Sequence, residues 1–202
     1  MKRRKQLYGL LILLAVMITG LLLVAWQLGS PQTGSGSTSS PPRLPQSAAE
    51  AAAVLRTWLT EHGSADDAIV ACTLTLSPRT LAESGWTFQV YSAQKNRLLV
   101  ARVHVEEVQI LRDIVSRYPP VVLSAAAWKH DSEDILTTWW REGGASAWNA
   151  TATPTLVLRL GMREDRIPAW QLTLEKDNTR VMDYWEIRAD TGMLLEHSSG
   201  GR

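Results

Sequence analysis

The chain of 202 residues has little cysteine, histidine or phenylalanine, and these shortages exclude several kinds of site. Its single cysteine, Cys72, excludes an intramolecular disulfide, and we expect it to pack as a small apolar side chain. No Cys/His spacing suits zinc, and none of the four histidines lies in an HExxH motif or beside a plausible nucleophile. The sequence therefore predicts no metal site, no cofactor and no enzyme.

Acidic side chains are absent before Glu50, which makes the charge of the chain asymmetric. Lys2, Arg3, Arg4 and Lys5 form a basic cluster, although the formal net charge is only +1. Without that cluster, 17 of the 21 basic side chains remain against 20 acidic ones. This mildly acidic remainder does not support a nucleic-acid partner.

An uncharged apolar run, LYGLLILLAVMITGLLLVAWQL, follows the basic cluster from Leu7 to Leu28. At ~1.5 Å per residue it matches the ~30 Å core of a bilayer. It is longer than the apolar part of a cleaved signal peptide, ~7 to 15 residues, and no small-x-small site or lipoprotein cysteine follows it. We therefore predict an uncleaved transmembrane anchor in contact with the bilayer (residues 1–28), a cytoplasmic N-terminus and an extracytoplasmic remainder in the cell membrane.

Residues 29–46 are mostly Gly, Ser, Thr and Pro, a composition that buries no apolar face. We expect a disordered linker between the anchor and the folded part.

The folded part contains two similar stretches, VLRTWLTEHG at residues 54–63 and ILTTWWREGG at residues 135–144. Trp86 and Trp170 correspond in the same way at an offset of 84 residues. Self-similarity of this kind suggests a duplicated unit. Each unit then needs a large side chain, Trp58 or Trp139, to cover its own sheet.

Both units follow one order of predicted elements. The first has a helix that opens with a capping box at Ser47 and Glu50 and ends at Gly63, and the second has a helix capped by Asp131 and ended at residues 143–144. Strand-like segments follow at residues 68–76, 86–93 and 98–105, and again at residues 153–160, 169–176 and 181–188. The predicted fold class is α+β: a transmembrane helix, then two tandem helix-plus-three-strand antiparallel, cystatin-like units at residues 47–118 and 119–202.

The stretch AWQLTLEKDNTRVMDYWEIRADTGMLLEH, residues 169–197, resembles the PepSY domain. That family ends in a strand, a D-x-x-T-G turn and a short apolar strand. Here Thr191 and Gly192 match the turn, and Arg188 stands where aspartate is usual; the first unit has Val108 and Gln109 instead and would be a degenerate copy. The whole plan is similar to the small bitopic TseB-like cell-wall regulators of bacteria.

The resemblance implies extracytoplasmic binding of an envelope protein, a membrane enzyme or a peptidase, without a catalytic centre. We therefore expect a protein-interaction or regulatory module of the bacterial cell envelope. Two alternatives stay open: an assembly component of a secretion or pilus machine, and an envelope enzyme. Only His104 and Glu106, on one face of a strand, favour the enzyme.

The predicted strand 181–188 supplies the candidate partner-binding residues. Alternation places Asp183, Trp185 and Ile187 on one face of this strand. A helix covers one face only, so the other stays open and offers an aromatic ring between charges, which is typical of a binding surface. The predicted partner-binding residues are Tyr184, Glu186 and Arg188.

Overall fold

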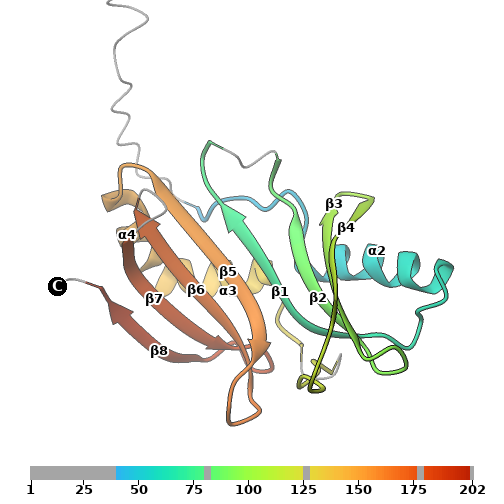
Figure 1. Cartoon of the computed structure of the whole chain (residues 1–202). Helices are drawn as coiled ribbons and strands as arrows, with labels where there is room; N and C mark the ends of the chain where they lie inside the picture. The colour runs from blue at the N-terminus through green and yellow to red at the C-terminus, as the bar shows by residue number, and fades with distance from the viewer. Residues whose placement is uncertain (1–39, 80–82, 125–127, 177–179, 201–202) are drawn as a thin grey trace, which may run out of the picture. The chain divides into compact units, whose positions relative to one another are not determined.

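A computed structural model describes residues 40–79, 83–124, 128–176 and 180–200 (Figure 1). The predicted anchor, Leu7 to Leu28, lies outside these residues. Among the described residues, no helix is both long and apolar enough to cross a membrane. The predicted transmembrane helix, its role as a signal anchor and the single-pass membrane localisation are therefore not supported by the described residues, and we propose none of them for this chain.

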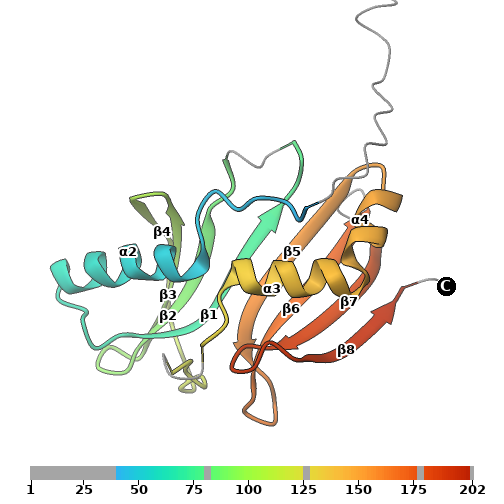
Figure 2. The same ribbon diagram turned by 180° about the vertical axis from the view of Figure 1, so that it is seen from behind.

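The described residues build one antiparallel sheet of eight strands in the order β4-β3-β2-β1-β5-β6-β7-β8. Helices α2 and α3 lie on the same face of this sheet, behind it in Figure 1 and in front of it in Figure 2. The helical segments are α2 (Ala48–Glu61), α3 (Ser132–Trp139), the π-helical turn η3 (Trp140–Gly144) and α4 (Ala145–Ala150). The strands are β1 (Ala68–Leu76), β2 (Trp86–Ser92), β3 (Arg97–His104), β4 (Glu107–Val115), β5 (Pro154–Met162), β6 (Pro168–Lys176), β7 (Arg180–Arg188) and β8 (Leu194–Ser199).

The prediction of two tandem helix-plus-three-strand units is wrong. A helix is followed by four strands in each half, and pairing of β1 with β5 joins all eight strands into one sheet. Strand β4 was not predicted from the sequence for two reasons. Val105, with φ of 55°, begins the β3–β4 turn without a Gly, Asn or Pro signal, and a bulge interrupts the alternation of β4 opposite Val100 and Ala101.

The capping box predicted at the start of α2 is confirmed. The Ser47 hydroxyl accepts a hydrogen bond from the Glu50 amide at 3.2 Å, and the Glu50 carboxylate accepts one from the Ser47 amide at 2.9 Å. The folded part begins before this cap, however, because Leu44 packs against the core and the Gln46 carbonyl accepts a hydrogen bond from the Trp86 indole.

The cap of α3 serves both helices. The Asp131 carboxylate accepts hydrogen bonds from the Ser132 amide of its own helix at 2.7 Å and from the Ala49 amide of α2 at 3.1 Å. In turn, the Ser132 hydroxyl accepts a hydrogen bond from the Ala48 amide at 2.9 Å. The two positive helix ends therefore meet at one carboxylate, which a helix macrodipole favours.

The repeated tryptophans of the two halves meet in the core. Trp86 and Trp170 contact each other edge to face, with ring centroids 6.0 Å apart. Each indole N–H donates to a carbonyl 40 residues earlier, in Gln46 for Trp86 and in His130 for Trp170, both at 3.0 Å. The equivalence predicted from the sequence is thus also an equivalence of contacts.

The helix tryptophans behave differently in the two halves. Trp139 is completely buried, as predicted, and its ring packs edge to face against Trp185 at 5.8 Å. Trp58 packs against the edge of the core but is only half-buried and stacks on His62 at 4.0 Å, so its predicted burial is incomplete. The tight turn predicted at Gly192 is confirmed, with φ of 69° and hydrogen bonding between its amide and the Arg188 carbonyl.

Replacement of Asp131 by Ala should destabilise the fold by about 2 kcal/mol, because two helix starts lose an acceptor. Asp131→Asn keeps an acceptor oxygen and should restore most of the loss. Glu133→Ala, an exposed change in the first turn of α3, is the matched control. Urea unfolding measures all three free energies, and an Asp131→Ala cost no larger than that of Glu133→Ala would contradict the shared cap.

Gly144→Ala should cost about 1 to 3 kcal/mol, because a Cβ at this position would lie 2.3 Å from Cε2 of the buried Trp139. Gly161→Ala is the control, since a Cβ there meets no heavy atom within 4 Å. Thermal unfolding gives the cost, and near-UV circular dichroism reports the displaced indole. Equal stability of the two variants would refute this packing.

Candidate interaction surface

The three predicted partner-binding residues lie on the sheet face opposite the helices. The neighbouring Trp185 marks the helix side, because its indole N–H donates to the Glu142 carbonyl at 3.2 Å. Alternation along β7 then turns Tyr184, Glu186 and Arg188 to the other face. This placement agrees with the sequence-based expectation, whereas the role in partner binding stays a prediction.

Glu186 is largely occupied by contacts inside the molecule. It is only 4% exposed, and its Oε2 atom lies 2.5 Å from Nη1 of Arg163 in the β5–β6 turn. Its Oε1 atom accepts a hydrogen bond from the Gln171 side chain at 3.3 Å. Both carboxylate oxygens thus have partners, so removal of this side chain would also affect folding.

Arg188 forms a two-pronged ion pair with Asp190, at 2.9 Å from Nε and 2.6 Å from Nη2. Hydrogen bonding to Asp190 raises the pKa of Arg188, and the same contact lowers the pKa of Asp190. Burial raises the pKa of the Tyr184 hydroxyl, and the charges of Glu186 and Glu196 raise it further. Tyr184, Glu186 and Arg188 therefore form a polar cluster on the open face of the sheet, and side chains of the same chain already pair with Glu186 and Arg188.

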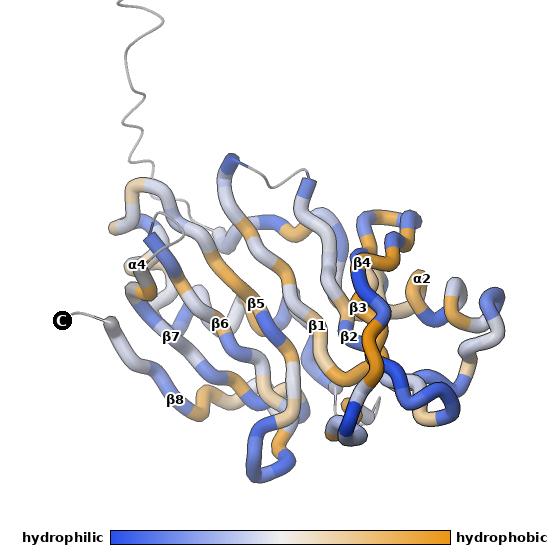
Figure 3. Tube along the Cα trace, viewed as in Figure 1, coloured by the Kyte–Doolittle hydropathy of each residue, from blue (hydrophilic) through white to orange (hydrophobic). Residues whose placement is uncertain are grey.

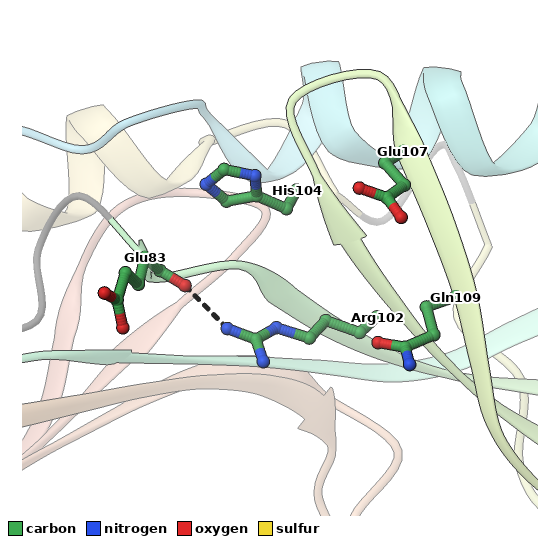
Figure 4. Close-up of a pocket in the computed structure, with 5 residues that line it drawn as sticks. All are labelled: Glu83, Arg102, His104, Glu107 and Gln109. Carbon is green, nitrogen blue, oxygen red and sulfur yellow. Dashed lines mark hydrogen bonds between the residues drawn. The ribbon is translucent and has the colours of Figure 1, made fainter.

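The two residues that favoured an enzyme do not lie on one strand face. His104 is the last residue of β3, whereas Glu106 lies exposed in the turn that follows. Opposite His104 in the ladder stands Glu107. His104 instead lines a shallow surface pocket of about 280 Å³ (Figure 4); its lining residues are Glu83, Arg102, His104, Glu107 and Gln109.

All five residues that line this pocket are polar or charged. The Arg102 guanidinium donates to the Glu83 carbonyl at 2.6 Å, and its side chain extends toward Glu83 (Figure 4). Within the described ranges, no three His, Cys, Asp or Glu side chains come close enough to hold a metal ion. Cys72 is fully buried, and burial raises the pKa of its thiol, which keeps it protonated and unreactive.

The most unusual surface follows residues 105–122, which we call the β4 edge. Eight of the nine residues of β4 are exposed, and an apolar stretch of it is visible as orange tube in Figure 3. Ten large apolar side chains are exposed among the described residues, and eight of them belong to the β4 edge: Val105, Ile110, Leu111, Ile114, Val115, Tyr118, Val121 and Val122.

The opposite edge strand of the same sheet, β8, can be compared directly with β4. Strand β8 holds the same outer position in the second half that β4 holds in the first. It has six residues, LLEHSS, and its last four are exposed and polar. Since an outer strand of this sheet does not need exposed aliphatic side chains, those on β4 require another explanation. Sequence reasoning missed this surface because the strand itself was not predicted.

Arg188→Gln should raise the pKa of Asp190 toward its ordinary value of 3.8. The pKa of Asp190 is lowered in the folded state, so the ion pair contributes stability above that ordinary value and loses it as pH falls through the folded-state pKa. Carboxyl-carbon NMR during a pH titration measures the shift. Lys129→Gln, which removes a more weakly acting charge, should change it less. An unchanged Asp190 titration in Arg188→Gln would disprove the pairing.

Comparison with known proteins assigns no function to this surface. No family model matches the chain, and no curated protein sequence matches it. Among solved structures, one described as a "putative lipoprotein" from Clostridium difficile 630 is similar, with a TM-score of 0.49 and 10% sequence identity over 71% of this chain and 88% of that one. A likeness of this size carries no argument about fold or function, and the resemblance to PepSY domains stays a prediction.

Proposed function

We propose that this chain is a non-catalytic protein-interaction module whose partner docks on the β4 edge. The observation that carries the proposal is the concentration of exposed apolar side chains on residues 105–122, with only Val181 and Met193 exposed in the same way among the other described residues. Exposed apolar side chains that gather on one segment of a protein surface often mark an interaction site.

The energy available from covering these side chains is considerable. Complete burial of an exposed aliphatic side chain contributes roughly 1.5 to 3 kcal/mol. Ile114 and Val115 are 49% and 68% exposed, so covering each of them contributes a part of this free energy. Arg112 and Asp113 lie between the apolar positions and give the surface polar points that fix orientation. A few well-covered residues of this type suffice for a specific protein contact.

The chemistry of the rest of the molecule supports binding in preference to catalysis. His104 and Glu107 share an open surface pocket, and the charge of the buried Glu186 is neutralised by the partly exposed Arg163. The resemblance of residues 169–197 to PepSY domains adds the class of partner. We propose an enzyme or peptidase of the bacterial cell envelope, which the module regulates by binding.

The test is cross-linking of the full chain in cells of its own organism, followed by purification of the cross-linked partner. We expect the cross-links to fall within residues 105–122. A Leu111→Glu/Ile114→Glu double variant should lose them and weaken binding of the purified partner by about tenfold or more, which corresponds to ~1.4 kcal/mol.

The matched control is Ser198→Glu on β8, which adds a charge to the other outer strand and should leave binding unchanged. Both variants change exposed positions, so their melting temperatures should stay close to that of the parent. Cross-links that lie elsewhere, or full binding by the double variant, would refute the docking site.

A further inference from the structure

We infer that the partner binds residues 117–122, the sequence Arg-Tyr-Pro-Pro-Val-Val, in a groove of its own that is lined by aromatic side chains and has an acidic rim. The segment enters this groove in a preformed extended conformation. This inference rests on the proposed function and adds the mode of recognition and the chemistry of the partner. We call these six residues the YPP segment.

The YPP segment is held at both ends. Before it, the Ser116 amide donates to the Asn96 carbonyl at 3.0 Å, and the Ser116 hydroxyl donates to the Tyr118 carbonyl at 2.7 Å. After it, the Leu123 amide donates to the Ile69 carbonyl of β1 at 2.9 Å, and the Leu123 side chain is buried. The residues between these two anchors are therefore presented in a defined place on the sheet.

Two prolines restrict the backbone between the anchors. Pro119 and Pro120 each fix φ near about −65°, and a residue that precedes proline is held in the extended or polyproline region. Tyr118 and Pro119 both precede a proline, so three consecutive residues have little freedom to lose. Pre-organised segments of this type bind aromatic grooves at a small entropic cost.

All side chains of the segment are exposed except that of Pro120, which is half-buried. Of the large apolar side chains that the structure describes, Tyr118 is the most exposed, at 82%, and Val121 and Val122 are 51% and 41% exposed. Proline rings and a tyrosine pack well on Trp and Tyr faces. Arg117, exposed just before them, sets the direction of binding through an acidic side chain on the groove's rim.

Addition of a partner strand to β4 is the competing mode, and the structure disfavours it. A bulge between the pairs Val100–Arg112 and Ala101–Ile110 bends β4, and edge bulges oppose continuous strand pairing. Charged side chains at Glu107, Arg112 and Asp113 act in the same sense. The YPP segment carries no such obstacle, because groove recognition needs no ladder of backbone hydrogen bonds.

The test uses the full chain with the photoreactive residue p-benzoylphenylalanine at Tyr118 or, in a second preparation, at Ile114. Cross-linking in cells is followed by competition on a lysate with a synthetic peptide of residues 116–123. We expect an adduct at position 118 that this peptide suppresses at least tenfold. The same peptide with alanine at both proline positions should need an at least tenfold higher concentration for equal suppression of the adduct. The cross-linked site in the partner should lie among aromatic residues.

The outcomes separate this inference from the proposed function. An adduct that resists the peptide but disappears in Leu111→Glu/Ile114→Glu would overturn the groove mode and leave docking on β4 intact. Equal potency of the two peptides would also overturn it. The absence of adducts at both positions 118 and 114 would refute the proposed function itself. Pro119→Ala/Pro120→Ala in the full chain changes one exposed and one half-buried ring and should lower the melting temperature only slightly, through the greater freedom of the unfolded chain. This variant must reduce the adduct at position 118 if the inference is right.

Discussion

The antiparallel pairing of β1 with β5 is the contact on which the rest of the fold depends. At its centre Leu74 faces Leu158, and these residues are 84 positions apart, the same offset that relates Trp86 to Trp170. The two halves are thus related by an approximate two-fold about this ladder. Because they share one sheet, their cores are continuous, and the two helix starts meet beside it at the Asp131 carboxylate.

The approximate two-fold allows contacts that the fold requires to be distinguished from features that it does not require. Contacts present in both halves, such as the hydrogen bonds of Trp86 and Trp170 to carbonyls 40 residues earlier, belong to the architecture. Features in one half only need another reason. The apolar exposure of β4 and the polar exposure of β8 differ although the two strands occupy equivalent edges, and this difference is what carries the functional argument.

The sequence predicts those parts of the structure that depend on neighbours in the chain. The capping box at Ser47, the cap at Asp131 and the turn at Gly192 follow from local chemistry, and all three are present. The pairing of β1 with β5 joins residues 80 to 88 positions apart, from Leu76 with Leu156 to Cys72 with Leu160, and no local pattern encodes it. The same holds for the candidate site: alternation placed Glu186 on the open face, but its ion pair with Arg163 depends on a turn 23 residues away.

The topology also explains why the surface lies where it does. Strand β4 ends at the outer edge of the sheet, whereas α3 must start near the centre, beside α2, so the chain has to pass along the end of the sheet. A connection outside the ladder leaves backbone amides without strand partners, and prolines lack the amide hydrogen that would need one. Pro119 and Pro120 therefore suit the connection structurally, and by stiffening it they hold Tyr118 in solvent. The arrangement of the strands thus requires a connection from β4 to α3, and the same connection presents Tyr118 in a restricted, exposed conformation that suits binding of a partner.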